Sequence, residues 1–128
     1  MPPVTEIKTQ DDYKKLLAKY RFVIINAMRS GPGSKNYFSG IVYDMLSDEL
    51  RYNPEEFVLA RLNIDKEPDL AKKVAEKLDV QQDVPFIVAY KKGMRVDSLI
   101  EPTPGCFQNF VKAWVKKEGR PVYWATKK

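Results

Sequence analysis

The sequence predicts a single α/β domain with a mixed sheet, and three features of the chain support this fold class. The apolar run Phe22–Ile25 is continuous rather than alternating, which is typical of a strand covered on both faces of a sheet. Segments with apolar residues at helical spacing alternate with strand-like segments along the chain. Finally, Lys92-Gly93 predicts a tight hairpin turn, so two neighbouring strands are expected to run antiparallel.

The first half of the chain is predicted to alternate strand, helix, strand and helix. Val4–Ile7 is a short candidate edge strand, and Thr9 is the predicted N-cap of the first helix. The central strand follows at Phe22–Ala27. A second helix is predicted over Ser34–Leu50, with a bend near Gly40 because glycine weakens a helix interior.

The second half begins with a strand and a helix. Phe57–Ile64 has the β-branched and aromatic content of a strand. Pro68 suits the first position of a third helix, and the apolar residues at helical spacing continue to Leu78.

A β-hairpin and a final helix complete the predicted fold. Phe86–Tyr90 is an apolar strand, and Arg95–Ile100 is expected to pair back along it as an edge strand. Glu101–Gly105, with its two prolines, is predicted to be a rigid loop. The last helix buries Phe107 and other apolar residues and is expected to stop at Gly119.

Composition and charge exclude several functional classes. The chain has 128 residues, 22 Lys and Arg, 17 Asp and Glu, one cysteine and no histidine. Without histidine there is no histidine general base and no zinc site built on imidazole. No apolar run approaches the ~20 residues that span a bilayer, and the start does not resemble a signal peptide. We therefore expect a cytoplasmic or nuclear protein, with no membrane association, no bound cofactor or metal, and no specific nucleic-acid signal.

The stretch that follows the central strand is the candidate site. Arg29, Ser30, Gly31, Pro32, Gly33 and Ser34 supply turn chemistry between the strand and the second predicted helix. Such a loop presents backbone N–H groups at a helix N-terminus, where an anion or a peptide carbonyl can bind. Arg29 and Lys35 could hold a small anionic ligand there, although solvated side chains are the commoner explanation for two such residues.

Two stretches of the sequence are similar to the thioredoxin family. Ser-Gly-Pro-Gly-Ser-Lys at 30–35 resembles the family's loop, in which Trp-Cys-Gly-Pro-Cys-Lys joins a strand to a helix. The stretch Leu62–Gly93 resembles the family's region from its third strand to the strand after Val-Pro. The resemblance covers roughly residues 5–118. It implies a thioredoxin-like domain over 1–118, with four to five strands flanked by four helices, and an extension over 119–128.

The resemblance also implies that dithiol chemistry has been lost. If Gly31-Pro32 are laid on the family's Gly-Pro, Ser30 and Gly33 take the cysteine positions and Ile24 takes that of a buried acid. If the strand and helix are aligned without a gap, Asn26 takes the acid's place and the motif falls on 32–35. Both alignments lack the thiolate and the resolving thiol that disulfide exchange needs.

A binding role is the function that the resemblance favours. Val84-Pro85 matches the family's cis-proline, so we expect a cis bond there and a shallow groove formed with the loop and with Glu101 and Pro102. Such a groove could take a protein partner by main-chain pairing, as an adaptor or a chaperone-like module. The alternative is an enzyme or a small-ligand protein with other chemistry. Cys106, the lone cysteine, is interpreted as a small buried hydrophobe or as a regulatory thiol.

Overall fold

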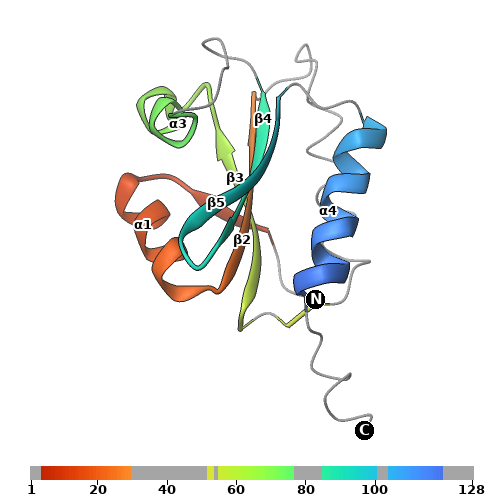
Figure 1. The fold of residues 1–128 in the computed structure, drawn as a ribbon. Coiled ribbons are helices and arrows are strands. Elements are labelled where there is room, and N and C mark those ends of the chain that lie inside the picture. The colour runs from red at the N-terminus through yellow and green to blue at the C-terminus, as the bar shows by residue number, and fades with distance from the viewer. Residues whose placement is uncertain (1–3, 30–51, 54, 77–84, 101–103, 120–128) are drawn as a thin grey trace, which may run out of the picture.

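The computed structural model describes residues 4–29, 52–53, 55–76, 85–100 and 104–119 (Figure 1). Within these ranges the chain forms five strands and three helices. In chain order they are β1 (Thr5–Ile7), α1 (Gln10–Lys19), β2 (Phe22–Met28), β3 (Phe57–Asn63), α3 (Pro68–Val74), β4 (Phe86–Lys91), β5 (Met94–Ile100) and α4 (Pro104–Glu118). The helix predicted over Ser34–Leu50 lies outside the described residues.

The strands form one mixed sheet in the order β1-β3-β2-β4-β5. β3 runs parallel to both β1 and β2, whereas β4 is antiparallel to β2 and β5 is antiparallel to β4. Helices α1 and α3 cover one face of the sheet and α4 covers the other (Figure 1). The α/β class, the mixed sheet and the central position of the Phe22 strand are therefore confirmed.

β2 is buried on both faces because its side chains alternate between two hydrophobic cores. Val23, Ile25 and Ala27 pack into the core beneath α1 and α3. Phe22 and Ile24 pack into the core beneath α4. A strand enclosed in this way needs apolar residues at consecutive positions, which explains the continuous run in the sequence.

The predicted start of the first helix, α1, and the predicted end of the last helix, α4, are confirmed. Thr9 accepts a hydrogen bond from the Asp12 N–H, and the Asp12 side chain accepts one from the Thr9 N–H, so α1 begins with a capping box. α4 ends at Glu118, and Gly119 follows it. A Cβ atom at Gly119 would lie 2.5 Å from the Val115 carbonyl oxygen, so glycine is needed there for close approach.

The hairpin turn is confirmed, and two element bounds differ from the predictions. Lys92 and Gly93 both have positive φ angles, 52° and 81°, as a two-residue type I′ turn requires. α3 ends at Val74 rather than continuing to Leu78. Pro104 and Gly105, which we predicted in a loop, belong to α4, because proline is well suited to a first helical position where its missing N–H costs no hydrogen bond.

Candidate functional site

The predicted site lies at one end of the sheet. Ala27 of β2 pairs with Phe86 of β4, and Phe86 pairs with Ile100 of β5, so the end of β2, the start of β4 and the end of β5 meet there. The beginning of α4, in lighter blue, lies at the same end (Figure 1).

Arg29 and Pro85 are the predicted loop and groove residues that the structure describes. Ser30, Gly31, Pro32, Gly33, Ser34, Val84, Glu101 and Pro102 lie outside the described residues. The arrangement of the loop and the existence of the groove therefore stay predictions. So does the cis form of the Val84–Pro85 bond.

Arg29 leaves the end of β2 and forms an ion pair. Its Nε donates to the Asp65 carboxylate at 3.1 Å, and both side chains remain partly exposed. Asp65 is held in place by a turn after β3, in which the Asn63 side-chain oxygen accepts hydrogen bonds from the Asp65 and Lys66 N–H groups. The carboxylate offsets the positive charge of Arg29, which weakens the case for a site that binds a small anion through this residue.

The two candidate positions for a buried acid both lie on the α4 side of β2. Ile24 is fully buried in the core there. Asn26 is 2% exposed, pairs with Arg61 and Ile87 on the neighbouring strands, and donates through Nδ2 to the Met28 sulfur at 3.5 Å. An isoleucine and an amide do not ionise in the physiological pH range. In either alignment, this buried position of the central strand cannot exchange a proton with a neighbouring thiol.

Pro85 and Cys106 also lie at this end of the molecule. Pro85 is half-buried and directly precedes β4. Cys106 lies near the start of α4 and is exposed, so our interpretation of it as a small buried hydrophobe is wrong. The amphipathic pattern of α4 places Phe107, not Cys106, in the core. As the only cysteine of the sequence, Cys106 cannot form a disulfide within the chain.

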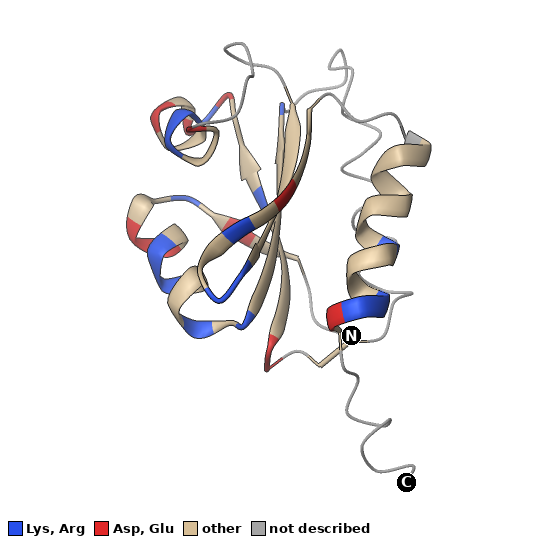
Figure 2. Cartoon of the chain, viewed as in Figure 1, with Lys and Arg blue, Asp and Glu red and all other residues tan. Residues whose placement is uncertain are grey.

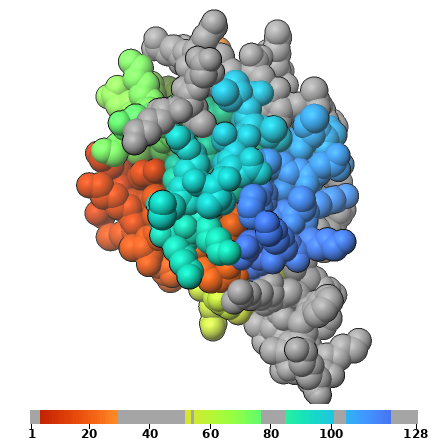
Figure 3. Space-filling view, in the orientation of Figure 1, coloured from red at the N-terminus to blue at the C-terminus, as the bar shows by residue number. Residues whose placement is uncertain are grey.

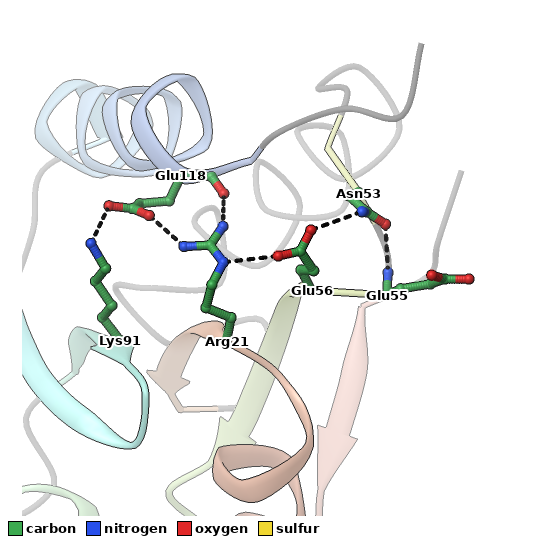
Figure 4. A network of polar contacts seen from close by, with 6 residues as sticks. All are labelled: Arg21, Asn53, Glu55, Glu56, Lys91 and Glu118. Atoms are coloured by element: carbon green, nitrogen blue, oxygen red, sulfur yellow. Dashed lines mark hydrogen bonds and ion pairs between the residues drawn. The ribbon is translucent and has the colours of Figure 1, made fainter. Parts of the chain in front are cut away.

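The opposite end of the sheet holds an ion cluster that the sequence did not predict (Figure 4). The Arg21 guanidinium donates to the carboxylates of Glu118, at 2.5 Å, and Glu56, at 3.0 Å, and also to the Glu118 main-chain oxygen. Lys91 donates to the second Glu118 oxygen at 3.0 Å, and Asn53 donates to Glu56 at 3.1 Å. These contacts join the start of β2, the start of β3, the end of β4 and the end of α4.

Glu118 and Arg21 are held in their charged forms. Burial raises the pKa of the Glu118 carboxyl, but the hydrogen bonds from Arg21 and Lys91 outweigh it and leave this pKa below its ordinary value. Burial likewise opposes the charged form of Arg21, yet its two carboxylate partners raise the pKa of the guanidinium overall. Each charged side chain of the cluster contacts at least one side chain of opposite charge. We therefore interpret the cluster as a structural contact that attaches α4 to the sheet rather than as a reactive site.

Tyr90 is a further described residue whose pKa is strongly shifted, and it contacts a second tyrosine, Tyr13. The Tyr13 and Tyr90 hydroxyls lie 3.0 Å apart, and their rings meet edge to face. Burial and the hydrogen bond with Tyr13 raise the pKa of Tyr90 well above its ordinary value. Tyr90 is therefore a neutral core residue of the α1 side and not a proton donor for a reaction.

The described ranges contain no cluster of three or more His, Cys, Asp or Glu side chains placed to hold a metal ion. In the same ranges, every helix is too short or too polar to cross a membrane.

Comparisons with known proteins identify the fold. No protein-family model and no curated protein matches this chain. Among solved structures, the thioredoxin of Malassezia sympodialis matches with a TM-score of 0.66 and 19% identity, over 93% of this chain and 96% of that one. Plasmodium falciparum thioredoxin matches with a TM-score of 0.64 and 18% identity, over 87% and 99% of the two chains. Mitochondrial thioredoxin 3 of Saccharomyces cerevisiae matches with a TM-score of 0.59 and 16% identity, over 86% and 94%. The chain has the thioredoxin fold.

Proposed function

We propose that this chain is a protein-binding domain that has the thioredoxin fold without its dithiol chemistry. The observation that carries the proposal is the cysteine count: the one cysteine, Cys106, lies on α4, and the loop after β2 contains none. Disulfide exchange between a dithiol and its substrate needs two thiols, one to attack and one to resolve the mixed disulfide. Neither Asn26 nor Ile24, the two candidates for the buried acid of β2, is an acid, which is consistent with a loss of dithiol chemistry.

The proposed binding surface is the sheet end that carries Arg29 and Pro85. The loop residues Ser30–Ser34 would form one wall, and Val84, Glu101 and Pro102 would form the other. An extended segment of a partner could pair there with main-chain groups beside Pro85, and such pairing needs no reactive side chain. An adaptor or chaperone-like role would follow from this mode of binding.

A small anionic ligand is the competing occupant of the same surface. It would depend on the positive charge of Arg29, which the structure pairs with Asp65. A bound protein segment does not need that charge, because main-chain hydrogen bonds and side-chain contacts provide most of its affinity. We therefore favour the protein partner.

The test is co-purification of the tagged chain from its own cells, with a bulky substitution in the loop. Gly31→Trp should abolish recovery of any stoichiometric partner, whereas Ala18→Trp, on the exposed side of α1, should leave recovery unchanged. A partner recovered equally well with Gly31→Trp would contradict the proposed surface.

A charge swap separates a direct role of Arg29 from its ion pair. Arg29→Glu removes the pair with Asp65, and the double variant Arg29→Glu/Asp65→Arg can form it again in the reverse sense. If Arg29 contacts the partner, both variants lose it. If Arg29 only stabilises the turn after β3, the double variant recovers the partner.

A further inference from the structure

Exposed apolar side chains gather on one strand. Among the described residues, the large hydrophobic side chains that are strongly exposed are Met94, Val96 and Ile100, with exposed fractions of 72%, 45% and 40%. All three belong to β5. Single exposed hydrophobic residues are ordinary, whereas several on one strand can mark a contact surface. Met94 pairs with Lys91 beside the turn, so Val96 and Ile100 are the two apolar residues toward the other end of the strand.

β5 is an edge strand of the described sheet, so one side of its backbone has no neighbouring strand there. Figure 3 shows β5 at the surface, between α1 and α4. The other edge strand, β1, has only three residues and is flanked by an ion pair between Glu6 and Arg61. Short edges and charges hinder the addition of a strand. β5 is longer, with seven residues, and it carries three exposed apolar side chains beside its two charged residues, Arg95 and Asp97.

A β-bulge determines which part of β5 can accept a strand. Arg95 pairs with Tyr90 and Asp97 pairs with Ala89, so Val96 is an extra residue in the ladder. Bulges interrupt regular pairing on both sides of a strand and so protect its edge. Beyond the bulge, the pairing from Asp97 to Ile100 is regular. This stretch is the part of the edge that another strand can extend. The Ser98 N–H there donates to the Asp97 carboxylate at 2.8 Å, a hydrogen bond that a bound strand would replace.

The charge around β5 is strongly positive. β4, β5, the turn between them and α4 together carry six cationic residues against two carboxylates, among the residues that the structure describes. Figure 2 shows the cations on the β4–β5 hairpin and toward the end of α4. The cations are Lys91, Lys92, Arg95, Lys112, Lys116 and Lys117.

Both carboxylates that the structure describes in these elements are already engaged. Glu118 is buried and bound by Arg21 and Lys91. Asp97 accepts a hydrogen bond from the Trp114 indole at 2.8 Å. Two of the cations are engaged as well, since Lys91 contacts Glu118 and Arg95 donates to the Glu76 main-chain oxygen at 2.7 Å. Because the cations of these elements outnumber their carboxylates, the surroundings of the edge favour an acidic partner.

We propose that the β5 edge binds an extended segment of a partner protein with alternating apolar and acidic residues. The segment pairs with Asp97–Ile100 as a sixth strand of the described sheet. Its apolar side chains cover Val96 and Ile100, and its acidic side chains face the cations of the hairpin and of α4. This surface does not include the loop that contains Arg29, although it adjoins that end of the sheet, since Ile100 pairs with Phe86 beside Pro85. The inference does not depend on the proposed function.

A synthetic probe tests the proposal with the full chain. The probe is a short acetylated peptide of alternating glutamate and valine residues, observed by amide NMR shifts and hydrogen exchange of the protein. We expect binding to slow the exchange of amides within Asp97–Ile100. Two control peptides isolate the causes: one has lysine in place of glutamate, and one is N-methylated at alternate residues, which removes its strand hydrogen bonds. Each should bind at least about tenfold more weakly.

Matched charge substitutions locate the site. Ile100→Glu removes an apolar contact and adds a charge that repels the peptide, so it should weaken binding at least about tenfold. Ala18→Glu adds the same charge on the exposed side of α1 and should leave binding unchanged. Both positions are exposed at the surface, so neither substitution is expected to prevent folding.

Three results would overturn the proposal. The first is no binding of the glutamate–valine peptide. The second is binding that shifts the amides around Arg29 but not those of Asp97–Ile100, which would support the proposed loop surface and exclude β5. The third is a dimer in sedimentation experiments that Ile100→Glu dissociates, because the occupant of the edge would then be a second copy of this chain.

Discussion

Replacing Glu118 by glutamine removes one charge from the ion cluster that attaches α4 to the sheet. The Glu118 side chain is only 6% exposed and contacts both Arg21 and Lys91. Glutamine has nearly the same shape, so the packing of the helix end is preserved. Its amide oxygen can accept one of the two hydrogen bonds, but its NH2 group cannot accept the other.

The expected loss of stability depends on the contacts that Arg21 and Lys91 keep in the variant. Removing one partner of a fully buried pair costs about 3–5 kcal/mol, because a charge is left without compensation. Arg21 still donates to Glu56 and to the Glu118 main-chain oxygen, and the Lys91 side chain is 41% exposed and can be hydrated. We therefore expect Glu118→Gln to lower the free energy of unfolding by about 2–3 kcal/mol.

The effect should depend on pH in a defined direction. The pKa of Glu118 is lower in the folded protein than in the unfolded chain, so the unfolded chain binds more protons as the pH falls. The stabilisation is fully present above the unfolded pKa, about 4.3, and is lost as the pH falls through the folded pKa. The stability difference between wild type and Glu118→Gln should therefore shrink below about pH 4.

Urea unfolding followed by far-ultraviolet circular dichroism, repeated at several pH values, measures this difference. Glu55→Gln is the matched control, because it makes the same chemical change at an exposed residue near the cluster and should cost less than about 0.5 kcal/mol. The reasoning would be refuted by a Glu118→Gln loss as small as the control's. A difference that stays constant from neutral to acidic pH would refute the pH dependence.

Three further substitutions test other parts of the structure. Gly119→Ala should cost about 1–3 kcal/mol in urea unfolding, because its Cβ would lie 2.5 Å from the Val115 carbonyl oxygen; a neutral result would contradict that close approach. Gly93→Ala should cost about 1 kcal/mol in the same assay, since alanine is strained at a φ of 81°, and an unchanged midpoint would exclude the type I′ turn. Tyr90→Phe should cost about 1 kcal/mol at neutral pH by removing the hydrogen bond to Tyr13. The pKa of Tyr90 is raised on folding, so its contribution is fully present below the unfolded pKa, about 10, and declines as the pH rises from there toward the folded pKa. A spectrophotometric titration in which every tyrosine ionises near pH 10 would contradict its burial.

The fold could be predicted because its signals are local. The run Phe22–Ile25 identified the central strand, since a strand between two cores needs apolar residues at every position. Lys92-Gly93 identified the hairpin, because few residue pairs adopt two positive φ angles. The bulge at Val96 has no such local signal, since one extra residue in a ladder depends on the partner strand.

The candidate site was predictable only in part, because contacts between distant residues depend on strand register. The strands next to Arg29 and Pro85 were predicted, since Arg29 directly follows β2 and Pro85 directly precedes β4, but the role of both residues in a site stays a prediction. The Asp65 partner of Arg29 was not predicted, because it depends on the parallel pairing of Met28 with Asn63. The Arg21–Glu118 pair spans 97 positions of the sequence, and no pattern along the chain indicates it.

Reduction of insulin disulfides with dithiothreitol tests the central claim most directly. The wild type should not accelerate the reaction beyond dithiothreitol alone. The two variants Ser30→Cys/Gly33→Cys and Pro32→Cys/Lys35→Cys restore two thiols in the two alignments, and one of them should gain activity. Acceleration by the wild type that Cys106→Ser abolishes would contradict the account, because a lone thiol on α4 would then perform the chemistry that we infer to be lost.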